Sequence, residues 1–240
     1  MRGRDRIVAA LDVPDPAAAA ALARKLSGHV GMVKVGLELF VAHGRAALEA
    51  VRPSGLPIFL DLKLHDIPQT VEAAARGAGA LGAALVTVHA SGGADMIAAA
   101  RRGLSAGASA AGVAAPKLLA VTVLTSLGAD DLRDLGFVGT PAETVLRLAR
   151  LALKAGADGL VCSPEEVGQL RRDLGASPLL VVPGIRPAGS AAADQRRTGT
   201  PRAAVDAGAS LLVLGRPLRD SPDPAATADS IAADLDAMMD

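Results

Sequence analysis

Eight short apolar runs, each followed by a stretch of helical character, constrain what this chain of 240 residues can fold into. Their residues are continuously apolar rather than alternating with polar ones, which is typical of parallel strands in a sheet that is covered on both faces. We expect the strands at 6–11, 31–37, 56–63, 85–89, 118–124, 160–162, 179–182 and 211–214. Eight such units favour an α/β fold with a single domain, 1–240, built as a (β/α)8 or TIM barrel, a fold that commonly takes about 250 residues.

The segments between the runs predict the helices of this barrel. One helix follows Pro16 and is closed by Gly28. The others are expected at 40–51, 68–81, 93–104, 141–154, 165–174, 201–207 and 225–239, with a short helical turn at 130–135. The stretch 184–200 is rich in Gly, Ala, Pro and polar residues and is expected to be a long loop. The stretch 105–115 is rich in Ala, Gly and Ser, and the sequence leaves open whether it is ordered. No G-x-G-x-x-G follows the first strand, so an open sheet that binds a dinucleotide is the weaker alternative.

Composition argues against several kinds of partner. The chain carries 25 basic and 25 acidic residues and only 1% aromatic residues, whereas nucleic-acid binding needs a basic surface and, for single strands, aromatic stacking. The sequence has no run of 18 apolar residues and therefore predicts no membrane span. Asp12 and Pro14 interrupt any apolar region of a signal peptide. We therefore expect a cytoplasmic protein without a membrane partner. Cys162 is the only cysteine, which excludes an internal disulfide, and its apolar surroundings predict a buried strand residue.

The segment 61–70, DLKLHDIPQT, turns ionic directly after an apolar strand. Because strand side chains alternate, Asp61 and Lys63 should project to the same face, and Asp66 follows within a short loop. Two carboxylates would then bracket one ammonium group at the mouth of an apolar core. Burying such charges costs several kcal/mol per ion unless they are well paired, so a structural ion pair is a weaker interpretation than chemistry.

Other polar residues also fall where strands end, and active sites of barrels gather at the carboxyl ends of the strands. The set comprises Asp12, Lys34, Asp61, Lys63, Asp66, His89, Thr125, Arg186 and Arg216. Arg186, Arg216 and the amide of Gly215 follow the seventh and eighth strands, which is the usual phosphate site. His89 could be catalytic or structural. The acidic residues have no metal-ligand spacing, and an ammonium group between carboxylates already neutralises them, so no metal is expected.

Seven motifs together resemble the bacterial form of the orotidine 5'-phosphate decarboxylase family. They are ALD at 10–12, VKVG at 33–36, DLKLHDIPQT at 61–70, LTS at 124–126, PGIRP at 183–187, DQ at 194–195 and LGR at 214–216. A wider group of decarboxylases shares D-x-K-x-x-D, whereas PGIRP and the downstream Gln195 make the resemblance specific to the orotidine 5'-phosphate decarboxylase family. It implies conversion of orotidine 5'-phosphate to UMP, the last step of pyrimidine nucleotide synthesis, without metal or organic cofactor.

The resemblance also implies a role for each matching residue. Lys63 would protonate carbon 6 of the pyrimidine, with Asp61 against the leaving carboxylate and Lys34 in the same charged array. Asp66, Ile67 and Thr70 would come from the second subunit of a homodimer. The remaining substrate-binding positions implied are Asp12 and Lys34 at the ribose, Thr125 at the pyrimidine, Gln195, Gly215 and Arg216 at the phosphate with Arg186 close by, and Pro183 as a further contact.

Two other functions compete with this interpretation. A related decarboxylase that acts on 3-keto-gulonate 6-phosphate with magnesium shares the barrel and the D-x-K-x-x-D motif. We expect that enzyme to carry an acidic residue in its second strand, where this chain has Lys34. The second alternative is a non-catalytic phosphate-binding barrel. Buried charges add little stability, so the intact charged array argues against a chain without catalysis.

Overall fold

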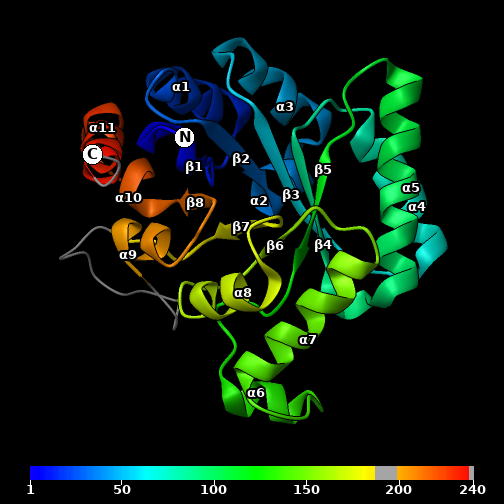
Figure 1. Cartoon of the computed structure of the whole chain (residues 1–240). Coiled ribbons are helices and arrows are strands. Elements are labelled where there is room, and N and C mark those ends of the chain that lie inside the picture. The colour runs from blue at the N-terminus through cyan, green and yellow to red at the C-terminus, as the bar shows by residue number, and fades with distance from the viewer. Residues whose placement is uncertain (187–198, 238–240) are drawn as a thin grey trace.

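The computed structural model describes residues 1–186 and 199–237, and its centre is a closed barrel of parallel strands (Figure 1). Each strand pairs with the next along the chain, and β8 pairs with β1 to close the ring. The strands are β1 Ile7–Ala10, β2 Met32–Gly36, β3 Ile58–Leu64, β4 Leu85–His89, β5 Lys117–Val121, β6 Gly159–Val161, β7 Leu179–Val182 and β8 Leu211–Leu214. The predicted (β/α)8 barrel is therefore confirmed.

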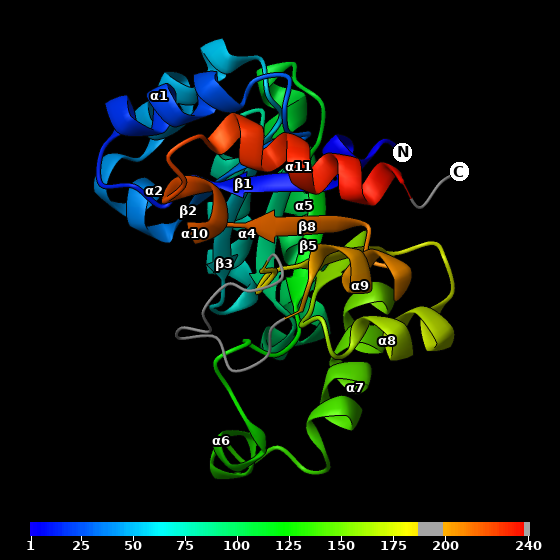
Figure 2. The same cartoon turned by 90° about the vertical axis from the view of Figure 1, so that its left-hand side faces the viewer.

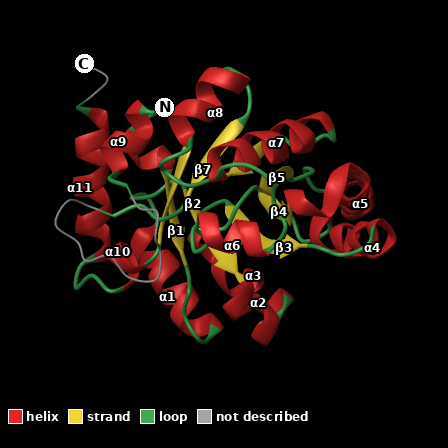
Figure 3. Cartoon of the chain, turned by 90° about the horizontal axis from the view of Figure 1, so that it is seen from below, coloured by secondary structure: helices red, strands yellow, loops and turns green. Residues whose placement is uncertain are grey.

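Helices surround the barrel on its outside (Figure 3). They are α1 Pro16–Leu26, α2 Leu37–His43, α3 Arg45–Val51, α4 Pro68–Gly79, α5 Gly93–Ala111, α6 Ala129–Asp134, α7 Pro141–Lys154, α8 Val167–Leu174, α9 Pro201–Asp206, α10 Arg216–Arg219 and α11 Pro224–Asp236. Several begin with proline after a residue whose side chain caps the first turn. Asp15, Thr140 and Asp223 each accept a hydrogen bond from a backbone N–H of that turn. In Figure 2, α6 stands away from the barrel.

The structure corrects two predictions about helices. The helix expected at 40–51 is two helices, α2 and α3, which meet at Gly44 with a φ of 54°. The helix expected at 93–104 extends to Ala111, into the stretch 105–115 whose order the sequence left open, and Gly112 ends it in the left-handed conformation. Glycine lowers helix propensity, but here tertiary packing against α4 outweighs that preference. The short helix α10 was not predicted.

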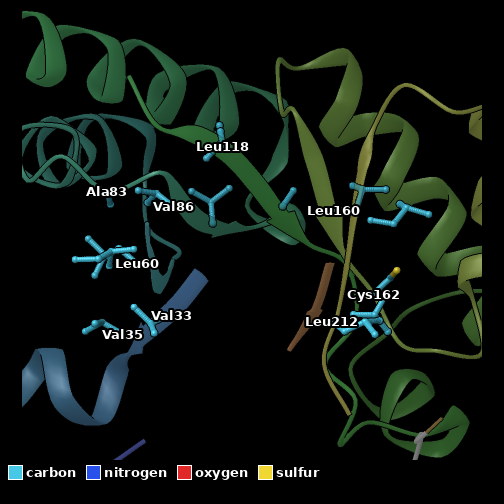
Figure 4. Close-up of a cluster of buried hydrophobic side chains, with 14 of the residues drawn as sticks. Val33, Val35, Leu60, Ala83, Val86, Leu118, Leu160, Cys162 and Leu212 are labelled. Carbon is cyan, nitrogen blue, oxygen red and sulfur yellow. The ribbon is translucent and has the colours of Figure 1, made fainter. Parts of the chain in front are cut away.

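Two apolar layers hold the barrel together, one on each side of the sheet. The inner layer comprises Val8, Ala10, Phe59, Leu85, Leu119, Val181, Leu211 and Val213. The outer layer lies between strands and helices, and Figure 4 shows part of it, including Val33, Leu60, Val86, Leu160 and Cys162. Neighbouring residues of one strand alternate between the layers. Cys162 is buried as predicted, although it directly follows β6 rather than lying within it.

Candidate active site

The inward-facing residues of the first three strands change from apolar to charged toward the carboxyl ends. On β3, Phe59 belongs to the inner apolar layer, and Asp61 and Lys63 follow at intervals of two. Ala10 ends β1, and Asp12 follows two residues later, just past the strand. Because all strands are parallel, these changes occur at one end of the barrel. The charged end of the barrel is therefore built by the same alternation that builds the core.

A cavity of about 620 Å³ opens at this end of the barrel. Nine of the predicted site residues line it: Asp12, Lys34, Asp61, Lys63, Thr125, Pro183, Arg186, Gly215 and Arg216. The cavity thus brings together residues from the segments that follow β1, β5, β7 and β8 with residues of β2 and β3. Glu38 of α2 and Arg219 of α10 also line it and were not predicted.

Four of these side chains form a chain of alternating charge. Lys34 Nζ lies 3.1 Å from Asp12 Oδ1 and 3.6 Å from Asp61 Oδ2. Lys63 Nζ lies 2.7 Å from the same Asp61 Oδ2. The expectation that Asp61 and Lys63 share a face is confirmed. Each charge has an opposite neighbour, which offsets the free-energy cost of holding these groups at a partly dry site.

The carboxyl group of Asp61 is the most buried acid of this chain of charges, with about 7% of the residue exposed. Burial raises its pKa, but the positive charges of Lys34 and Lys63 lower it, as do hydrogen bonds from Lys63 and Thr87. The lowering contributions are larger in sum, so the pKa of Asp61 lies below its ordinary value. Asp61 is therefore a carboxylate at neutral pH, and it is held close to two ammonium groups.

Lys63 reaches this position with an unusual backbone. Its φ is +49°, in the left-handed region that costs a non-glycine residue roughly 1–2 kcal/mol. The pairing of β3 with β4 also shifts register between Leu60 and Leu64. Regular strand alternation did not predict this distortion. Strained backbone of this kind tends to persist where the surrounding structure fixes it and where function uses it.

Lys34 depends on the absence of a side chain at Gly36. A Cβ atom at this position would lie 2.7 Å from Lys34 Nζ and 3.2 Å from Asp12 Oδ1. Both distances are below ordinary contact, so a larger residue would displace the ammonium group or the carboxylate. Gly36 lies inside the motif VKVG, but the sequence alone did not indicate why it matters.

Asp66, Ile67 and Thr70 do not line the cavity of their own chain. All three are exposed, at the start of α4 and just before it. Asp66 Oδ1 accepts a hydrogen bond from the N–H of Ile67, and within residues 1–186 and 199–237 it forms no ion pair. The expectation that Asp61 and Asp66 of one chain bracket Lys63 is therefore wrong for the described chain.

Arginine side chains gather where β7 and β8 end. Arg186 follows β7, and Arg216 follows Gly215 at the start of α10. Arg219 lies one turn further along α10, and its guanidinium group donates to the backbone oxygen of Asp12 at 3.2 Å. Recognising α10 in the sequence would have indicated Arg219, because residues three apart share a helix face. Gln195 and most of the predicted loop 184–200 lie outside the described residues.

His89 ends β4 but does not line the cavity. Its ring centre lies 5.5 Å from that of His65, and the two rings are tilted by 39°. Burial lowers the pKa of His89, and the neighbouring His65 and Lys63 lower it further. The imidazole ring is therefore neutral near pH 7, and its contacts are with the segment that follows Lys63.

The described residues contain neither a metal site nor a membrane-spanning helix. None of their His, Cys, Asp and Glu side chains form a group of three or more that could hold a metal ion. Among residues 1–186 and 199–237, no helix has both the length and the apolar character needed to cross a membrane.

Known proteins resemble this chain over nearly its whole length. A family model described as "Orotidine 5'-phosphate decarboxylase / HUMPS family" matches residues 5–231. A protein named orotidine 5'-phosphate decarboxylase from Anaeromyxobacter sp. (strain K) is 58% identical over 235 residues, which cover 98% of this chain and 100% of that protein. The protein of the same name from Gluconobacter oxydans (strain 621H) is 50% identical and covers 98% and 99%.

Solved structures agree with these sequence matches. The crystal structure of orotidine 5'-phosphate decarboxylase from Lactobacillus acidophilus has a TM-score of 0.85 and 41% identity, covering 98% of this chain and 99% of that chain. The protein of that name from Pyrococcus horikoshii OT3 has a TM-score of 0.76 and 26% identity, covering 95% and 98%. The chain belongs to the orotidine 5'-phosphate decarboxylase / HUMPS family.

Proposed function

We propose that this chain, acting as one barrel domain over 1–240, decarboxylates orotidine 5'-phosphate to UMP, the last step of pyrimidine nucleotide synthesis. The observation that carries the proposal is the alternating chain Asp12–Lys34–Asp61–Lys63 in a cavity that also contains Arg186 and Arg216. The names of the relatives support the same reaction. The arrangement suits a substrate with a phosphate at one end and a carboxylate at the other.

The proposed reaction breaks the bond between carbon 6 of the pyrimidine and its carboxylate. Carbon dioxide leaves, the electron pair stays on carbon 6, and a proton from Lys63 Nζ then forms the new C–H bond. An ammonium group that is already in place stabilises charge concentrated at carbon 6 better than the delocalised charge of the substrate. The neutral amine of Lys63 regains its proton from solvent after product release.

Asp61 has two roles in this proposal. It is ionised, so it holds the ammonium group of Lys63 at 2.7 Å. It would also face the substrate carboxylate, and two like charges about 4 Å apart repel by roughly 4 kcal/mol at an effective dielectric constant near 20. That repulsion is relieved when carbon dioxide leaves, which favours the transition state over the bound substrate.

The phosphate group would bind where β7 and β8 end. Arg186 and Arg216 supply guanidinium groups, and Gly215 supplies a backbone amide, a combination that suits a phosphate dianion. Asp12 and Lys34 would hold the ribose hydroxyls, Thr125 would contact the pyrimidine, and Pro183 lines the same cavity. Gln195 would bind the phosphate as well, as the motif DQ at 194–195 implies.

The proposal includes a cytoplasmic homodimer in which Asp66, Ile67 and Thr70 reach the partner's site. Ile67 is an apolar residue with about 65% of its surface exposed, and Asp66 and Thr70 are exposed beside it. Contact with a second copy would bury this apolar residue and bring a further carboxylate to Lys63. The reaction needs no metal, because lysine provides the proton and the lysine and arginine side chains provide the positive charge.

The test is turnover of orotidine 5'-phosphate followed by absorbance, with and without EDTA. We expect loss of substrate that EDTA does not slow, with one UMP formed per substrate consumed. Lys63→Ala should lower kcat on the order of 10²–10⁴-fold, the usual contribution of a general acid. Lys25→Ala, at an exposed lysine near the end of α1, is the control and should retain wild-type turnover.

Two results would contradict the proposal. Near-normal turnover by Lys63→Ala would remove lysine as the proton donor. Absence of turnover by the wild-type chain, together with magnesium-dependent decarboxylation of 3-keto-gulonate 6-phosphate, would assign the related sugar-phosphate reaction. If neither substrate reacts, a non-catalytic phosphate-binding barrel is the remaining alternative, and binding of inorganic phosphate would test it.

A further inference from the structure

Thr87 is a fully buried polar residue in the middle of β4. It has no exposed surface and does not line the cavity, so it cannot touch a substrate. Its hydroxyl group nevertheless joins two parts of the candidate site. It accepts a hydrogen bond from the backbone N–H of Lys63 at 2.9 Å and donates one to Asp61 Oδ1 at 2.8 Å.

The first of these bonds supports the distorted backbone of Lys63. The register of β3 and β4 shifts between Leu60 and Leu64, so the regular ladder is interrupted there. The N–H of Lys63 instead binds a side chain of the neighbouring strand. A partly buried N–H without a partner is unfavourable, and Thr87 therefore stabilises the left-handed conformation that aims the lysine side chain.

The second bond fixes the orientation of the Asp61 carboxylate. Thr87 occupies Oδ1, whereas Lys63 Nζ at 2.7 Å and Lys34 Nζ at 3.6 Å both lie near Oδ2. A carboxylate held at one oxygen cannot rotate freely about its last bond. Oδ2 is thereby kept toward the two ammonium groups.

The two bonds also depend on each other. A threonine hydroxyl has one hydrogen, and the carboxylate accepts it, so the oxygen lone pairs remain for the N–H of Lys63. One side chain thus sets the backbone of the lysine and the side chain of its acidic partner. Valine has nearly the same shape but can do neither.

We propose that Thr87 is a positioning residue for the reaction, because it fixes Lys63 and Asp61 in the geometry that proton transfer to carbon 6 requires. This inference rests on the proposed decarboxylation. A purely structural threonine would affect stability alone, whereas a positioning residue affects kcat in the folded enzyme and the pH at which activity is lost.

The pH dependence follows from the groups around Asp61. Lys34 on β2 and Lys63 on β3 face it directly, His89 on β4 is close enough to interact, and Asp12 faces it through Lys34. The hydrogen bond from Thr87 is one of the contributions that lower the pKa of Asp61. Without the hydroxyl group that pKa should rise, and the acidic limb of kcat should move to higher pH.

The experiment compares Thr87→Val with Thr87→Ser in the full chain, using turnover of orotidine 5'-phosphate. Thr87→Val should lower kcat by about 10²-fold, the effect of misplacing a catalytic group by about 1 Å, with KM changed little. Thr87→Ser keeps the hydroxyl and should restore most of kcat and the wild-type acidic limb. Thr144→Val removes another fully buried hydroxyl, on α7, and should leave both unchanged.

Each outcome decides the matter. Wild-type kcat and pH profile in Thr87→Val would overturn the inference, and so would a serine variant as slow as the valine variant. If Thr87→Val does not fold, Thr87→Cys replaces it, because its thiol is only a weak donor, and it should be slower than Thr87→Ser. A wild-type chain that does not convert orotidine 5'-phosphate contradicts the proposed function instead. In that case a crystal structure of the valine variant tests the positioning of Lys63 directly, and an unchanged Lys63 backbone would overturn it.

Discussion

Lys34 contacts two carboxylates because residue 36 leaves room for its ammonium group. The lysine side chain is flexible at its far end, so an added methyl group would move the ammonium group rather than unfold the chain. We expect Gly36→Ala to lower kcat/KM by about 10- to 100-fold, because a small displacement of the Lys34 ammonium group would weaken its contacts in the site. Its thermal midpoint should stay near that of the wild type.

Gly168→Ala is the matched control for this substitution. Gly168 lies in α8, and a Cβ there would make only ordinary contacts, at 3.6 Å from Arg172 and 4.0 Å from Ala207. It should leave kcat/KM unchanged. Full activity in Gly36→Ala would show that Lys34 has more freedom than the distances indicate.

The pKa of Asp61 predicts how stability depends on pH. Burial raises this pKa, but the nearby ammonium groups and hydrogen bonds together lower it by more than burial raises it. The pKa of Asp61 is therefore lower in the folded chain than in the unfolded one. The ionised carboxylate therefore stabilises the fold above the unfolded pKa of about 4, and this contribution is lost as pH falls through the folded pKa. Asp61→Asn should lower the free energy of unfolding by about 3–5 kcal/mol at pH 7, the usual result of breaking a buried pair.

Urea unfolding from pH 7 downward measures this effect. The difference between the wild type and Asp61→Asn should narrow once pH falls below about 4. Asp130→Asn is the control, because Asp130 pairs with Arg133 at an exposed position where such pairs contribute about 0–1 kcal/mol. A difference that stays constant across the pH range would contradict the lowered pKa of Asp61.

At the scale of elements, α4 and α5 pack unusually closely because glycines lie between them. A Cβ at Gly103 would collide with the backbone oxygen of Glu72, and one at Gly107 with that of Arg76. Neither backbone can move away easily. We expect Gly103→Ala to lower the free energy of unfolding by about 1–3 kcal/mol, as overpacking does.

Gly168→Ala again provides the comparison, now for stability. In a helix with room for the side chain, alanine should stabilise by about 0.5–1 kcal/mol relative to glycine. Urea denaturation of both variants should show a lower free energy of unfolding for Gly103→Ala and a higher one for Gly168→Ala. Equal effects would mean that helix propensity, rather than the contact of α4 with α5, decides the outcome at Gly103.

These glycines also explain where prediction from sequence failed at this scale. The sequence left the order of 105–115 open, whereas α5 extends to Ala111 and Gly107 lies against the backbone of α4. The strands were predictable because burial on both faces leaves a continuous apolar run. The charged residues at the strand ends were predictable because each charge directly follows an apolar run and so contrasts with it.

The site features that the sequence did not predict are not marked by a charge next to an apolar run. Thr87 is uncharged and lies inside a strand, and its position two residues before His89 was the only signal. Arg219 depends on a helix of four residues that sequence patterns do not resolve. The left-handed conformation of Lys63 arises from the pairing of two strands, which no local pattern encodes.

At the scale of the whole molecule, Asp66 raises the question of a second subunit. It is exposed and outside the cavity of its own chain, while the proposed reaction uses it beside Lys63. We expect Lys63→Ala and Asp66→Ala to be nearly inactive alone. Mixed and allowed to exchange subunits, they should recover about a quarter of wild-type activity, because a two-fold dimer then contains one intact site in half of the molecules.

Sedimentation velocity should show a dimer for each variant and for the mixture. A mixture that stays inactive despite subunit exchange would mean that Asp66 acts within its own chain or not at all. Ile67→Glu replaces the exposed apolar side chain with a charged one. This single variant should be more monomeric than the wild type and less active.

The cavity spans the place where the ring of strands closes. Its lysines and aspartates come from β1, β2 and β3, or directly follow them, whereas its arginines follow β7 and β8, and β8 pairs with β1. A ligand that binds both groups therefore braces the first strands against the last. Binding of such a ligand would therefore stabilise the closed barrel by mass action, and the thermal midpoint should rise with ligand concentration.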